Sequence, residues 1–129
     1  MIRVTILTAT SLLLAINCRA GFLDGTKAKV KVVPEQAAAD KGEKEFDDTL
    51  TFADDKFTSA AFLAKGFNPA SYRGEVEQKE AEFEVEQTSE ENGVLNWLGE
   101  IRGKKVLGRL QWRKNDGTNL SFDFEGTKE

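Results

Sequence analysis

Carboxylates are the main source of acid–base chemistry in this 129-residue sequence, which contains no histidine and a single cysteine, Cys18. The lack of histidine excludes Ser/His triads, histidine general bases, histidine-ligated haem and most zinc sites. No phosphate loop or dinucleotide fingerprint is present. The adjacent acidic pairs at 47–48, 54–55 and 90–91 lack the spacing of a calcium loop. We therefore predict no catalytic residue, no metal site and no cofactor, and we do not expect an enzyme.

The candidate ligand-binding residues are polar or aromatic side chains at positions where a strand would face inward. Asp48 is the most informative, because it shares its strand face with Phe46, Leu50 and Phe52. An inward carboxylate is costly unless it is hydrogen-bonded or lies near an opening. Because Asp48 comes early in its strand, a place at the rim of a barrel explains it more simply than ligand binding. The full candidate set is Thr26, Asp48, Tyr72, Gln87, Trp97 and Trp112.

The clearest secondary structure that would position these residues lies in three alternating runs between residues 94 and 127. A period of two is typical of strands with one buried face. The inward sets are Leu95, Trp97, Gly99 and Ile101, then Val106, Gly108, Leu110 and Trp112, then Leu120, Phe122 and Phe124. Polar turns at 102–105 and 114–118 join the runs, and Gly117 suits the positive φ of a short hairpin loop. The stretch therefore predicts an antiparallel meander.

Two glycines, Gly99 and Gly108, fall on the inward faces of neighbouring strands in this meander. Glycine inside a strand marks a bend or the close approach of another group. Their missing side chains would leave room for Trp97 and Trp112 in a tightly curved sheet. Core packing is the simpler interpretation of these aromatic residues, and a binding role is the alternative.

Five further strands are expected before the meander, at 22–33, 46–52, 56–64, 72–77 and 81–87, with a short helix at 35–42. The segment 56–64 is apolar on both faces, so its orientation is not fixed by its pattern. Eight short strands in succession predict an all-β fold, an eight-stranded antiparallel up-and-down barrel with one short helix between the first and second strands. The alternative is an open sandwich of two four-stranded sheets.

Residues 1–20 have the pattern of a secretory signal peptide, with Arg3 followed by an apolar run too short to span a membrane. We expect cleavage after Ala20, a single domain at 21–129, and a periplasmic or extracellular location. The alternative is lipidation of Cys18, although Asn17 is a poor fit before a lipidated cysteine. The net charge of −4 becomes −6 once Arg3 and Arg19 are removed, which argues against nucleic acid and against anionic lipid as partners.

Several stretches of the chain resemble a group of small exported bacterial proteins with a lipocalin-like, or calycin-like, barrel. They are Leu23–Thr26, Phe46–Tyr72, Gln87–Ser89, the W-x-G of Trp97–Gly99 and the segment Leu110–Gly117. The resemblance implies a barrel, export, and in calycins a ligand held at the barrel mouth. The G-x-W signature of true lipocalins is absent, since Lys27 follows Gly25 and Thr26.

Two functions fit these expectations. One is a binding module that holds a small apolar or amphipathic ligand at the barrel mouth. The other is a structural or protein-interaction module, inhibitor-like, with a filled barrel and an unknown protein partner. The many inward rings favour a mostly filled interior, with any ligand held at the mouth under the 35–42 helix. A cavity bordered by Tyr72, Trp97 and Trp112 would favour the first function, and an exposed apolar patch including Phe67 would favour the second.

Overall fold

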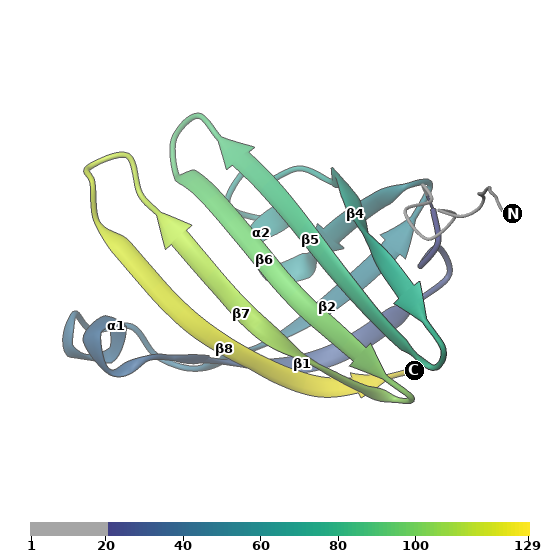
Figure 1. Cartoon of the computed structure of the whole chain (residues 1–129). Helices are drawn as coiled ribbons and strands as arrows, with labels where there is room; N and C mark the ends of the chain where they lie inside the picture. The colour runs from purple at the N-terminus through teal and green to yellow at the C-terminus, as the bar shows by residue number, and fades with distance from the viewer. Residues whose placement is uncertain (1–20) are drawn as a thin grey trace, which may run out of the picture.

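The computed structural model describes residues 21–129, so the predicted signal peptide and Cys18 lie outside the described residues. Eight antiparallel strands follow one another around a closed barrel in chain order, and β1 pairs with β8 to complete it (Figure 1). The strands are β1 Lys27–Pro34, β2 Phe46–Ala53, β3 Lys56–Ser59, β4 Ala70–Glu77, β5 Glu80–Ser89, β6 Gly93–Arg102, β7 Lys105–Arg113 and β8 Asn119–Lys128. The helices are α1 Gln36–Asp40 and α2 Ala60–Leu63. The predicted barrel is confirmed, and the open sandwich is wrong.

Aromatic rings fill the barrel, because the inward position of nearly every strand carries a large apolar side chain. The largest fully buried side chains are Trp97, Phe52, Phe57, Phe62, Phe67, Phe83, Phe122 and Phe124. Their rings meet edge to face or tilted, as for Phe52 and Phe83 at 5.0 Å and Phe57 and Trp97 at 5.1 Å between centroids. Such pairs add to the stability that their burial supplies. The expectation of a mostly filled interior is confirmed.

Gly99 and Gly108 lie opposite each other in β6 and β7, under the rings of the core. A Cβ atom on Gly99 would come within 2.2 Å of the ring of Phe83, and one on Gly108 within 2.6 Å of the ring of Phe124. No side chain fits in that space, so these two positions allow the rings to lie against the backbone. The predicted close approach is therefore confirmed, although the rings that use the space are phenylalanines.

The predicted strand at 56–64 is wrong in its second half, where Ala60–Leu63 forms the helix α2. Ser59 begins this helix, and its hydroxyl oxygen accepts from the backbone N–H of Phe62 at 3.2 Å. Alanine and leucine favour helix, and serine favours the N-cap. The first strand is also shorter than predicted, because residues 21–25 form a turn that buries Leu23.

Both ends of the barrel are covered by side chains from outside the strands. We call one the hairpin end, where β2 turns into β3, β4 into β5 and β6 into β7, and the other the helix end, where α1 and α2 lie. Leu23 is buried at the hairpin end, and Phe62 and Phe67 are buried at the helix end. Among residues 21–129, no helix has the length and apolar character required to cross a bilayer.

Candidate functional site

The side chain of Asp48 accepts hydrogen bonds from the backbone where β3 ends and α2 begins. Its carboxylate accepts from the backbone N–H of Thr49 at 2.7 Å, from that of Ala61 at 2.9 Å and from the hydroxyl of Ser59. Burial raises the pKa of Asp48, and these hydrogen bonds oppose the increase. The carboxylate therefore satisfies donors that β3 would have paired had it continued. This is a structural role that depends on α2.

Gln87 joins the core of the barrel to the loop that follows α2. Its side-chain carbonyl accepts from the indole N–H of Trp97 at 3.0 Å, and its amide donates to the backbone carbonyl of Asn68 at 2.9 Å. Gln87 and Trp97 are both almost completely buried. Both ends of the amide are thus occupied within the protein, as buried polar groups require.

Tyr72 and Thr26 lie at the hairpin end, where they fix the N-terminal turn. The hydroxyl of Tyr72 donates to the carboxylate of Asp24 at 2.7 Å and accepts from the backbone N–H of Leu23 at 2.9 Å. Burial, together with the hydrogen bond to Asp24, raises the pKa of Tyr72 to about 12. The backbone carbonyl of Thr26 accepts from the N–H of Phe52 at 2.9 Å, which ties the turn to β2.

Trp112 lies at the helix end, beneath the turn that joins β7 and β8. Its indole N–H donates to the backbone carbonyl of Asn92 at 2.7 Å, and its ring packs against Phe62 at 5.2 Å. The ammonium group of Lys114 lies 4.7 Å from the centroid of the ring, within the range of a cation–π interaction. The indole N–H of Trp112 therefore has a hydrogen-bond partner, and Lys114 covers one face of its ring.

The six candidate residues do not converge on one cavity. Asp48, Gln87, Trp97 and Trp112 surround α2 and the loop after it, whereas Thr26 and Tyr72 lie at the opposite end. The main hollows of residues 21–129 open on the outer surface. One reaches Tyr72 and Trp97 between the outer side chains of β4–β7, a second reaches Asp48 beside α2, and a third reaches Trp112 beside the β7–β8 turn.

Comparisons with protein-family models, with curated proteins and with solved structures found no match to this chain. The eight-stranded antiparallel barrel agrees with the fold that the lipocalin-like resemblance implies.

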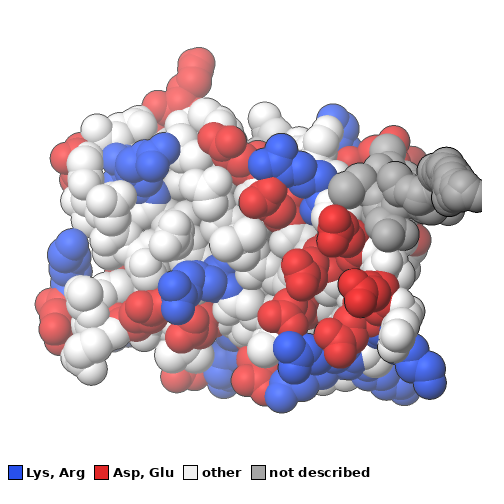
Figure 2. Space-filling model, in the orientation of Figure 1, with Lys and Arg blue, Asp and Glu red and all other residues white. Residues whose placement is uncertain are grey.

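A further candidate surface covers the outer side of β4, β5 and β6. None of the six residues chosen from the sequence belongs to it. Its carboxylates gather on the visible face toward the β4–β5 hairpin, at the lower right of Figure 2. We call this surface the acidic face; it consists of Glu75, Glu77, Glu80, Glu82, Glu84, Glu86 and Glu100. On its β6 border lies Leu98, 54% exposed, between Glu84 of β5 and Arg109 of β7.

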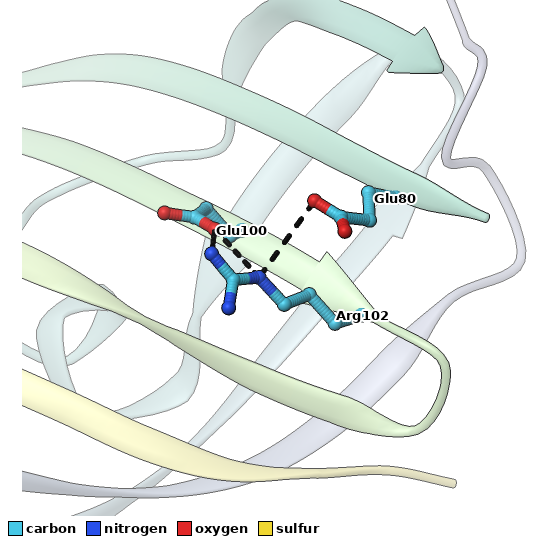
Figure 3. Close-up of polar contacts among 3 residues, drawn as sticks. All are labelled: Glu80, Glu100 and Arg102. Carbon is cyan, nitrogen blue, oxygen red and sulfur yellow. Dashed lines mark hydrogen bonds and ion pairs between the residues drawn. The ribbon is translucent and has the colours of Figure 1, made fainter. Parts of the chain in front are cut away.

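Two arginines neutralise part of the acidic face. Arg73 pairs with Glu84, and Arg102 lies between Glu100, at 2.6 Å, and Glu80, at 3.8 Å (Figure 3). The remaining carboxylates, those of Glu75, Glu77, Glu82 and Glu86, form no ion pair with any described residue. The acidic face is thus left with a net negative charge.

The strand register aligns three of these carboxylates in one row. Glu75 of β4 lies opposite Glu82 of β5, which lies opposite Glu100 of β6. Like charges directly opposite each other destabilise a sheet, by up to about 1 kcal/mol for each pair. The alternating glutamates of 75–86 indicated exposed strand faces in the sequence, but only the register shows that the rows coincide.

Proposed function

We propose that this protein is an exported, lipocalin-like interaction module that binds a cationic segment of another protein on the acidic face. The observation that carries this proposal is Leu98, a large apolar side chain 54% exposed on the β6 border of a surface whose carboxylates are incompletely paired. Protein interfaces commonly combine an apolar anchor with a charged, solvent-accessible rim. A partner with basic residues around an apolar side chain would complement both features.

The filled interior supports a surface function over a function inside the barrel. Phe62 and Phe67 cover the helix end, and Trp97 beneath them is 0% exposed. A ligand entering at that end would have to displace α2 and the loop after it, together with the hydrogen bond from Gln87 to Asn68. The strands of a closed barrel are also already rigid, so binding on their outer surface costs little conformational entropy.

The burial of Phe67 supports an interface on the sheet over one on the loop at 64–71. Phe67 of that loop is buried against Phe62 and Trp112, so the loop offers no apolar patch that includes it. Leu98, in contrast, projects from the middle of β6 between Asn96 and Glu100. Electrostatic attraction to the acidic face would raise the association rate of a basic partner.

The test is a titration of the protein with a short synthetic peptide rich in arginine and leucine, followed by calorimetry. Leu98→Ser should weaken binding about tenfold, since the loss of an anchor residue costs more than about 1 kcal/mol. Val33→Ser is the matched control, because Val33 is 42% exposed on β1, outside the acidic face. Added salt should also weaken binding. Equal affinities for the two variants, or binding that ignores salt, would overturn the proposal.

Native mass spectrometry of the purified protein tests the competing function. We expect the mass of the polypeptide alone, and Trp97 fluorescence that does not change when the peptide binds. A stoichiometric small molecule that co-purifies and quenches tryptophan emission would instead support a ligand at the barrel mouth.

A further inference from the structure

β4 carries an edge that no other described strand occupies. On one side it pairs with β5 over six positions, from Tyr72 to Glu77. On the other side it pairs with β3 at only two positions, Ser71 and Ala70, because β3 is short and begins at Lys56. The part of β4 from residue 73 to 77 therefore extends past the β2–β3 hairpin with a partner on one side only, as the position of the β4–β5 hairpin in Figure 1 shows.

The direction of the backbone groups follows from the tight turn that joins β4 and β5. Only Gln78 and Lys79 lie between Glu77 and Glu80, so these glutamates form the hydrogen-bonded closing pair of a two-residue hairpin. Alternation along an antiparallel pair then directs the N–H and C=O groups of Gly74 and Val76 away from β5. No other backbone hydrogen bond of the described residues reaches this segment.

The side chains along this edge leave the backbone accessible. Gly74 has no side chain to cover the edge; the backbone that approaches it closely is that of β5, since a Cβ there would lie 1.9 Å from the carbonyl oxygen of Glu82. Val76 is 39% exposed although it lies on the inward register, because the strand here extends beyond the covered interior. The N-terminal turn touches β4 through the hydroxyl of Tyr72, before the free segment begins.

We propose that residues 73–77 of β4 accept an extended cationic segment of the partner protein as an added antiparallel strand. This inference deepens the proposed function, on which it rests. The added strand lies beside β4, so a different part of the partner covers Leu98, which is on β6 with β5 in between. Strand addition supplies affinity through the backbone and specificity through alternate side chains. The outward side chains of the edge include Glu75 and Glu77, so lysine or arginine at every second position of the partner would face them. Apolar residues at the other positions would lie beside Val76.

Charge argues against a second copy of this chain as the occupant. Pairing β4 with β4 of another copy would bring the two acidic faces together, with Glu75 and Glu77 beside the same carboxylates of the copy. Like charges across paired strands repel. A cationic strand would instead be attracted to the carboxylates of this edge, so a cationic partner segment is favoured over a second copy.

Hydrogen exchange read by NMR tests the edge residue by residue. In the free protein, the amides of Gly74 and Val76 should exchange fast, while those of Glu75 and Glu77 are protected by β5. A peptide of alternating lysine and valine at saturating concentration should slow exchange of the first two amides about tenfold or more, with little change in the others. Fast exchange of both amides at saturation would overturn the inference, as would protection that depends on protein concentration, which would indicate a second copy.

Two N-methylated versions of the same peptide separate strand addition from charge attraction alone. Methylation removes the donor at alternate residues, so one version loses the N–H groups that face β4 and the other loses those that face solvent. The first should bind about tenfold more weakly than the parent, and the second should match the parent. If both bind equally well, strand addition is wrong although the acidic face still binds cations. If the unmodified peptide does not bind at all, this inference fails. If the arginine- and leucine-rich peptide also does not bind, the proposed function fails with it.

Discussion

The indole N–H of Trp97 donates to the side-chain carbonyl of Gln87 over 3.0 Å, inside a barrel where both side chains are almost fully buried. The amide of Gln87 then donates to the backbone carbonyl of Asn68. One glutamine thus satisfies the most deeply buried indole and holds the loop that covers the helix end.

Replacing Gln87 by leucine should lower the free energy of unfolding by about 2–4 kcal/mol, because the indole N–H and the carbonyl of Asn68 would both lose their partner. Urea unfolding followed by tryptophan fluorescence measures this change. Gln111→Leu is the matched control, since Gln111 lies on the exposed outer face of β7 and should change stability little. A cost for Gln87→Leu no larger than that of the control would contradict the role of this hydrogen bond.

Asp48→Asn should change the pH dependence of stability. Because the pKa of Asp48 is raised in the folded protein, its contribution is fully present below about pH 4 and declines as pH rises through the raised value. Asparagine can still accept from Thr49 and Ala61, and it cannot ionise. The variant should therefore gain stability relative to the natural protein as pH rises across that window. Thermal unfolding at several pH values measures this, with the exposed Asp47→Asn as control; a constant difference would refute it.

The single tyrosine of the chain makes the hairpin end easy to follow. Burial and Asp24 raise the pKa of Tyr72 to about 12, so its contribution to stability is complete below about pH 10 and is lost as pH rises toward about 12. Tyrosinate absorbance should show this titration directly. Asp24→Asn should move the pKa back toward the ordinary value, since it removes the neighbouring negative charge. An unchanged titration would show that Asp24 does not act on Tyr72.

Gly99→Ala should destabilise the barrel by about 1–3 kcal/mol, because the added methyl group would meet the ring of Phe83. A second substitution, Phe83→Leu, removes the ring and should make the alanine less costly than it is alone. A double-mutant cycle measured by urea unfolding gives the coupling between the two positions. Additive effects would show that the ring is not what excludes the methyl group.

Glu82→Gln should stabilise the protein while it weakens binding of the arginine-rich peptide. Glu82 lies between Glu75 and Glu100 in the carboxylate row, so its neutralisation should relieve up to about 1 kcal/mol of repulsion per pair. Glu91→Gln serves as the control for a general change of charge, because Glu91 is exposed in the turn between β5 and β6 and forms no ion pair with any described residue. If Glu82→Gln lowers stability, the carboxylates of the row do not repel one another enough to destabilise the sheet.

Alternation between apolar and polar residues was enough to predict most of the barrel. The meander at 94–127 and the preceding strand with Phe83 and Val85 lie as predicted, because one buried face per strand leaves a clear period of two. The prediction failed at 56–64, where apolar residues on both sides hide the period. Ser59 followed by two alanines was a helix start that could have been recognised.

Relationships between distant strands could not be predicted. Nothing in the sequence near Asp48 indicates that Ala61 will donate to it, since the contact exists only because α2 replaces the ladder. The carboxylate row likewise depends on the register of three strands, and a shift by one residue would disperse it. Five of the six candidate residues are buried on inward registers, whereas Thr26 lies before β1 and is only partly buried. Their separation between the two ends of the barrel could not be predicted from the sequence.

The pairing of β1 with β8 has a consequence for how the chain is made. Seven positions from Ala28 to Pro34 pair with residues between Phe122 and Lys128. The first strand therefore cannot complete its pairing until the last one has been synthesised. Until the ribosome has released residues up to Lys128, β1 and β7 each keep an unpaired border, and the barrel cannot close. Closure of the barrel therefore requires the strand of residues 27–128 that is synthesised last.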